Sequence, residues 1–97
     1  MDPEFFQRAD AQIALANSQL SDTTGPGRVS ASLLYSAARF NAWVSATGFA
    51  SGAEMAELRE QTVAYFVQEY THMLRENLDD YIQHFERYLQ TKPEEIP

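Results

Sequence analysis

Apolar residues recur at intervals of three and four along most of the chain, and no segment alternates convincingly between apolar and polar positions. This spacing places side chains on one side of an α-helix. Near the start the repeating residues are Phe6, Ala9, Ile13, Ala16 and Leu20. Asp2 is a good N-cap, Pro3 suits the first helical position, and Gly25-Pro26-Gly27 is typical of a stop. The pattern therefore predicts a first helix over residues 3–20.

The second apolar stripe lies in a stretch without acidic residues, from Arg28 to Ala50. Ser30 as N-cap and Gly48 near the C-terminus predict a helix over residues 31–47. Its main stripe consists of Leu33, Ala37, Phe40 and Val44, and small alanines occupy the opposite side. A helix with apolar residues on two sides is expected to pack between neighbours.

A third helix is predicted over residues 52–91, because Ser51 and Glu54 have capping-box spacing. Its length would be about 60 Å, twice that of either earlier helix. The segment 77–80 contains residues that favour caps, so a bend or break near Asn77 would give a fourth helix. In the alternative, the helix stays straight and its distal residues pack on a second copy. Those distal residues are Leu78, Tyr81, Ile82, Phe85 and Leu89.

The predicted fold is all-α, an antiparallel bundle of three helices in which the third is long. Ninety-seven residues, 44% of them hydrophobic, suffice for one core. We therefore expect a single domain over residues 1–91 and a flexible tail over residues 92–97. The chain has no cysteine, which excludes disulfides and thiolate metal sites.

Charge is unevenly distributed along the chain, whose formal net charge is -7. Residues 1–22 carry -3, residues 23–53 carry +2, and residues 54–97 carry -6. An acidic chain repels phosphate backbones, so a nucleic-acid partner is not expected. The N-terminus does not resemble a secretory signal, and no apolar run is long enough to span a bilayer. We expect a cytoplasmic protein that does not enter membranes.

One group of side chains on the predicted third helix contains residue types that commonly bind metal ions. Glu69 and His72 form a Glu-x-x-His pair, and Glu76 continues the same side. A single pair is half of a di-iron pattern, which needs a second pair and further carboxylates from other helices. We therefore read this stripe as a solvated helix face and expect no metal or other cofactor.

No catalytic signature is present. The chain lacks a nucleophile elbow, a P-loop and a dinucleotide fingerprint, and neither histidine has a fixed neighbour that would make it a base. We expect no enzymatic activity.

An aromatic and cationic strip on the second helix has two interpretations. Tyr35, Arg39 and Trp43 follow at intervals of four, which places a guanidinium between two rings. The strip would bind an anion or a small molecule in the functional interpretation. In the structural one, Arg39 pairs with an acid such as Asp10.

Aromatic rings on the predicted third helix exceed what one narrow core stripe requires. They are Tyr65, Phe66, Tyr70, Tyr81, Phe85 and Tyr88. Aromatic residues are enriched at interface hot spots. The main hypothesis is that the chain is an interaction or accessory protein that binds a protein partner or a second copy of itself. The candidate surface consists of Tyr81, Phe85 and Tyr88.

Three blocks of the sequence, FQRADAQIALANSQ, VSASLLYSAARFNAW and YFVQEYTHMLRENLDDYI, resemble a family catalogued as domain of unknown function 3144. The resemblance covers about residues 5–82. It implies a small, helical, cytoplasmic bacterial protein. It implies no activity, cofactor or catalytic residue.

Overall fold

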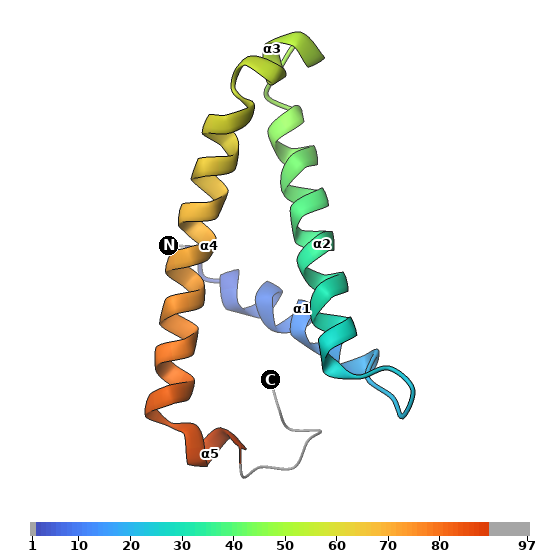
Figure 1. The fold of residues 1–97 in the computed structure, drawn as a ribbon, viewed down its shortest axis with the longest axis vertical. Helices are drawn as coiled ribbons and strands as arrows, with labels where there is room; N and C mark the ends of the chain where they lie inside the picture. The colour runs from blue at the N-terminus through green and yellow to red at the C-terminus, as the bar shows by residue number, and fades with distance from the viewer. Residues whose placement is uncertain (1, 90–97) are drawn as a thin grey trace. The chain divides into compact units, whose positions relative to one another are not determined.

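The computed structural model describes residues 2–89, which form five helices and no strand. The helices are α1 (Phe5–Ser18), α2 (Pro26–Ala46), α3 (Gly52–Glu57), α4 (Arg59–Gln83) and α5 (Phe85–Leu89) (Figure 1). The predicted all-α class is confirmed. No helix in this part of the chain is long and apolar enough to cross a membrane. The predicted tail and the predicted helix end at residue 91 lie outside the described residues.

The chain divides into two compact units, which comprise residues 2–40 and residues 41–89 of the described part. The division falls within α2, and each unit is described by itself. The antiparallel bundle and the single domain both concern the two units together, so they stay predictions.

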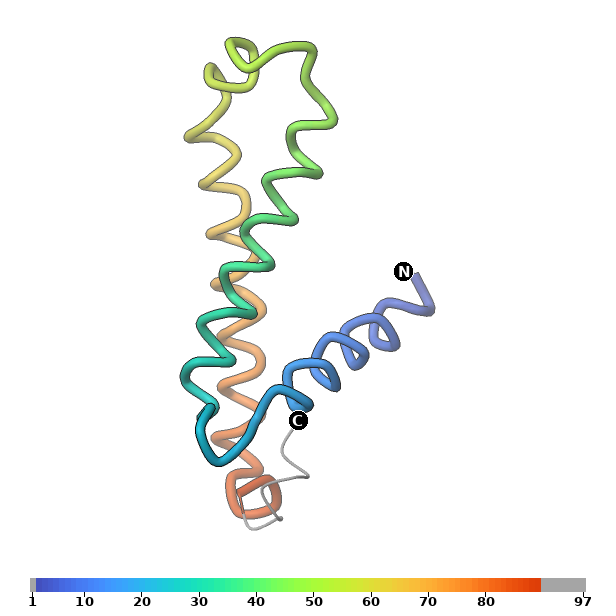
Figure 2. The backbone as a smooth tube through the Cα atoms, turned by 90° about the vertical axis from the view of Figure 1, so that its right-hand side faces the viewer, coloured from blue at the N-terminus to red at the C-terminus, as the bar shows by residue number. Residues whose placement is uncertain are grey.

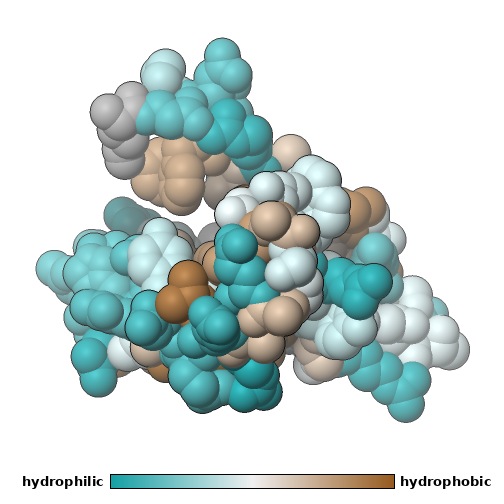
Figure 3. Space-filling view, turned by 90° about the horizontal axis from the view of Figure 1, so that it is seen from above, coloured by the Kyte–Doolittle hydropathy of each residue, from teal (hydrophilic) through white to brown (hydrophobic). Residues whose placement is uncertain are grey.

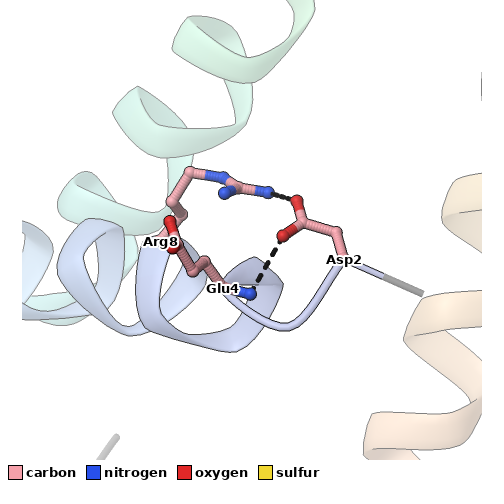
Figure 4. A network of polar contacts seen from close by, with 3 residues as sticks. All are labelled: Asp2, Glu4 and Arg8. Atoms are coloured by element: carbon pink, nitrogen blue, oxygen red, sulfur yellow. Dashed lines mark hydrogen bonds and ion pairs between the residues drawn. The ribbon is translucent and has the colours of Figure 1, made fainter.

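Helix α1 begins at Phe5, two residues later than predicted. The Glu4 backbone N–H donates a hydrogen bond of 2.9 Å to Asp2, and Arg8 forms an ion pair with the same carboxylate (Figure 4). The Arg8 bond, and after it the Glu4 bond, lower the pKa of Asp2. Asp2 thus caps the turn that precedes α1 and is not the N-cap of the helix.

Helix α2 begins at Pro26, so the predicted start at residue 31 is wrong. Proline lacks the N–H that the first helical turn leaves unbonded, and its fixed φ suits that turn. The chain instead turns between Ser21 and Thr24, joined by a backbone hydrogen bond of 3.0 Å, in the loop that Figure 2 shows between α1 and α2. Val29 lies in the first turns of α2. It is 7% exposed and is the single buried side chain among residues 2–89.

The second unit contains the predicted cap of the third helix. The Ser51 hydroxyl accepts a hydrogen bond of 3.1 Å from the Glu54 backbone N–H, which confirms Ser51 as the N-cap of α3. The helix is interrupted at Leu58, where the backbone leaves helical geometry (φ -106°, ψ 11°), and α4 begins at the next residue. The predicted continuous helix is therefore already divided near its start.

Helix α4 runs without interruption past Asn77, so the predicted bend or break there is wrong. The Asn77 side-chain amide donates a hydrogen bond of 2.8 Å to the Met73 carbonyl on the preceding turn. Its polar group is satisfied on its own helix and does not compete for the backbone. The helix ends instead at His84 (φ -116°, ψ 31°), and α5 follows at once.

Candidate functional site

One carboxylate ties the end of α4 to α5. The Asp80 carboxylate lies 3.0 Å from Nδ1 of His84 and accepts a hydrogen bond of 2.8 Å from the Tyr88 hydroxyl. The Tyr88 bond and then the His84 bond hold the pKa of Asp80 below its ordinary value. We call residues 80–89 the α4–α5 corner.

Aromatic rings pack inside this corner. The ring centroids of Tyr81 and Tyr88 are 4.4 Å apart, and the His84 ring meets Tyr88 edge-on at 6.3 Å. The guanidinium of Arg87 lies 5.3 Å from the Tyr88 ring centroid. Burial is the main cause that raises the pKa of Tyr81. Two of the three predicted aromatic surface residues, Tyr81 and Tyr88, thus contribute to the internal packing of the corner.

The outer side of the corner is apolar. Ile82 is 73% exposed, Phe85 59% and Leu89 45%, so neither α4 nor α5 covers them. We call these three residues the corner surface. Figure 1 shows α5 turning away from the axis of α4 at this point. Single exposed apolar residues are ordinary, whereas contiguous apolar patches are typical of interaction sites.

The corner is expected to loosen in acid. Above about 3.8, the ordinary pKa of an aspartate, Asp80 is ionised and its hydrogen bonds hold α5. Because the pKa of Asp80 is lower in the folded chain, this stabilisation is lost as pH falls through that lowered value. NMR signals of the Tyr88 ring, followed between pH 7 and pH 2, should change in this window. Asp80→Asn should abolish the transition and Asp79→Asn should keep it; an unchanged transition in Asp80→Asn would contradict the assignment.

The predicted strip on α2 is exposed to solvent. Tyr35 and Arg39 lie in the first unit, and Trp43 follows one turn later in the second. Among residues 2–89, Arg39 forms no ion pair with Asp10 or with any other acid. The structural interpretation of Arg39 therefore lacks its expected partner in the described part of the chain.

Replacing Arg39 with methionine is expected to change the free energy of unfolding by less than about 0.5 kcal/mol, as for surface substitutions in general. The side chain is exposed, and no ion pair within residues 2–89 would be broken. Urea denaturation followed by circular dichroism measures the change. Arg8→Met is the comparison, because Arg8 does form an ion pair. A loss of about 2 kcal/mol or more in Arg39→Met would restore the structural interpretation.

The candidate metal residues make only a local contact. Nε2 of His72 lies 3.1 Å from a carboxylate oxygen of Glu76 on the next turn, and both side chains are exposed. Glu69 is exposed on the preceding turn. Within residues 2–89, no three histidine or acidic side chains gather as potential ligands of one ion.

Sequence reasoning missed a hollow of about 360 Å³ in the second unit, where the end of α2 meets the start of α4. Its lining is mainly apolar and consists of Ser45, Gly48, Phe49, Leu58, Gln61, Thr62, Tyr65 and Phe66. Figure 3 looks onto the α3 end of the molecule and shows apolar and hydrophilic residues interleaved on that face. The signal in the sequence was Phe49, a half-buried aromatic residue between two helices. No charged side chain lines the hollow, and Ser45, Gln61 and Thr62 are the polar side chains of the lining that are not aromatic.

Sequence reasoning also did not predict that Asp80 contacts both His84 and Tyr88 in the α4–α5 corner. Asp80, His84 and Tyr88 follow at intervals of four, and this spacing was the available signal. Of the three, only Tyr88 belongs to the predicted aromatic surface. The bond from Tyr88 to Asp80 spans eight residues and depends on the helix break at His84.

Comparison with known proteins identifies the family. Residues 5–82 match the family described as Protein of unknown function (DUF3144), and the chain belongs to this family, as the resemblance predicted. The NMR structure of the protein NB7890A from Shewanella sp is similar, with 34% sequence identity and a TM-score of 0.77. The match covers 95% of this chain and 97% of that one. No curated protein matches.

Proposed function

We propose that this chain is an interaction or accessory protein of the cytoplasm that binds a partner protein through its aromatic helix surfaces. The observation that carries the proposal is the corner surface, where Ile82, Phe85 and Leu89 are exposed on a turn held by Asp80. The cysteine-free composition supports the compartment. No catalytic role forms part of the proposal.

The fixed geometry of the corner favours binding. Association is weakened by the entropy lost when flexible side chains and loops become ordered. Because Tyr88 is already bonded to Asp80 and its ring packs at a tilt against Tyr81, the turn that carries the corner surface is ordered before a partner arrives. Aromatic side chains such as Phe85 are also the type most enriched at interface hot spots.

Affinity capture from cells of the source organism tests the proposal. Two baits are compared: the wild type and a double variant that carries both Ile82→Ser and Phe85→Ser. The control bait is Val67→Ser, because Val67 is an exposed apolar residue elsewhere on α4. We expect a protein that is retained by the wild type and the control but lost by the double variant. The same proteins on all three baits would contradict the proposal.

Self-association of the chain is the alternative to a partner protein. Light scattering at high micromolar concentration measures it. A dimer that the double variant abolishes supports self-association through the corner, whereas a monomeric wild type excludes it.

A binder of small anions is a second candidate function, favoured by Arg39, which forms no ion pair among residues 2–89. Trp43, the single tryptophan, lies one helical turn from Arg39 and serves as a fluorescent reporter. Titration with inorganic phosphate and with benzoate should change its fluorescence in the wild type and leave Arg39→Met unchanged. Equal responses of both proteins would rule out binding at Arg39.

A further inference from the structure

We propose, on the basis of the interaction role above, that the corner surface docks a basic amphipathic helix of a partner protein. The proposal joins two features of the second unit: an apolar turn of fixed geometry and an excess of negative charge around it.

The apolar feature suits a helix as its occupant. Ile82 at the end of α4 and Phe85 and Leu89 on α5 are all exposed, so apolar side chains stand on both sides of the break at His84. Amphipathic helices bind exposed apolar surfaces through apolar residues on one of their own faces. Because Asp80 holds His84 and Tyr88 on the inner side, the outer residues are free of those contacts.

The charge around the corner surface is negative. Residues 75–89 contain four acids and two arginines, for a formal charge of -2 with histidine neutral. One of those arginines, Arg87, lies 5.3 Å from the Tyr88 ring centroid. The described residues of the whole unit, 41–89, contain eight acids and three arginines, which gives -5. The four acids of residues 75–89 are Glu76, Asp79, Asp80 and Glu86.

The negative charge around the corner surface favours binding of a basic helix over binding of a second copy of this chain. A dimer through this corner would bring two acidic segments together, and like charges at an interface are unfavourable. The net charge of -7 on each chain adds long-range repulsion. A helix with lysines or arginines flanking an apolar stripe satisfies both features.

The test uses the full chain and two synthetic helical peptides of about 18 residues, long enough to be helical in water. One peptide combines leucine with lysine in an amphipathic pattern, and the other replaces every lysine with glutamate. NMR titration of the isotope-labelled protein gives both the affinity and the residues whose signals shift. We expect the basic peptide to bind about tenfold or more tightly than the acidic one, with the shifts concentrated in residues 79–89.

Two substitutions report on the two features separately. Ile82→Ser should weaken binding of the basic peptide about tenfold, and the matched control Val67→Ser should leave it unchanged. Glu86→Lys should weaken binding and reduce its dependence on salt, while Glu57→Lys, on α3, should have a smaller effect.

Three results would overturn the proposal: shifts outside the corner, equal affinity for both peptides, or a dimer that Ile82→Ser abolishes. Each leaves the general interaction role standing if affinity capture still depends on Ile82 and Phe85. Failure of the capture experiment, with the basic peptide still bound at the corner, would instead count against a cellular partner of this surface.

Discussion

Replacing Val29 with alanine is expected to lower the free energy of unfolding by about 2 kcal/mol. Val29 is 7% exposed and is the buried side chain among residues 2–89. Removing its methyl groups loses their transfer free energy and leaves a cavity that the surroundings fill only in part. Urea denaturation, followed by far-ultraviolet circular dichroism, measures the loss.

The matched control is Val67→Ala, the same substitution at an exposed position on α4. It should change the free energy of unfolding by less than about 0.5 kcal/mol. Equal losses in the two variants would contradict the assignment of Val29 as the buried residue.

Replacing Ser51 with alanine is expected to cost about 1 kcal/mol, the usual value for loss of an N-cap hydroxyl. The Ser51 hydroxyl accepts the hydrogen bond from the Glu54 backbone N–H at the start of α3. Without it that N–H has no side-chain acceptor, and the loop that leads into α3 loses its anchor. Thermal and urea denaturation both measure the change.

Ser51→Asp should retain most of the stability, because a carboxylate caps a helix and is favoured by the helix dipole. Ser32→Ala is the control for the substitution itself, since Ser32 lies inside α2, where alanine is the better helix former. It should leave stability unchanged or raise it slightly. A loss in Ser32→Ala equal to that in Ser51→Ala would show that the cap contributes nothing.

The sequence predicted those parts of the fold that depend on local interactions. Ser51 was found because its bond spans three residues, and the helical class followed from the spacing of apolar residues. The start of α2 was placed wrongly because Pro26 is compatible with two local structures. Proline ends a helix when it stands inside one and begins a helix when it stands in the first turn.

The break in the long helix could not be placed from the sequence. Asn77 favours caps in general, yet its amide bonds to Met73 on the same helix and leaves α4 intact. The break falls at His84, beside a hydrogen bond that joins Asp80 to a residue eight positions further on. Such a bond becomes available only after the chain has turned, and helical periodicity does not reveal it.

The candidate site was predicted in part for the same reason. The sequence named Tyr81, Phe85 and Tyr88 as one aromatic surface, because a continuous helix would present them together. The structure instead places Tyr81 and Tyr88 against one another inside the corner and leaves Phe85 exposed. The helix break at His84 therefore determines which of these rings are exposed.

The central claim is that the corner surface serves binding and not folding, and the stability of Ile82→Ser with Phe85→Ser tests it most directly. Urea denaturation should give a free energy of unfolding within about 0.5 kcal/mol of the wild type for each substitution, because both side chains are already exposed. A loss of about 4 kcal/mol or more for the pair would show that the two residues belong to a hydrophobic core and would contradict the claim.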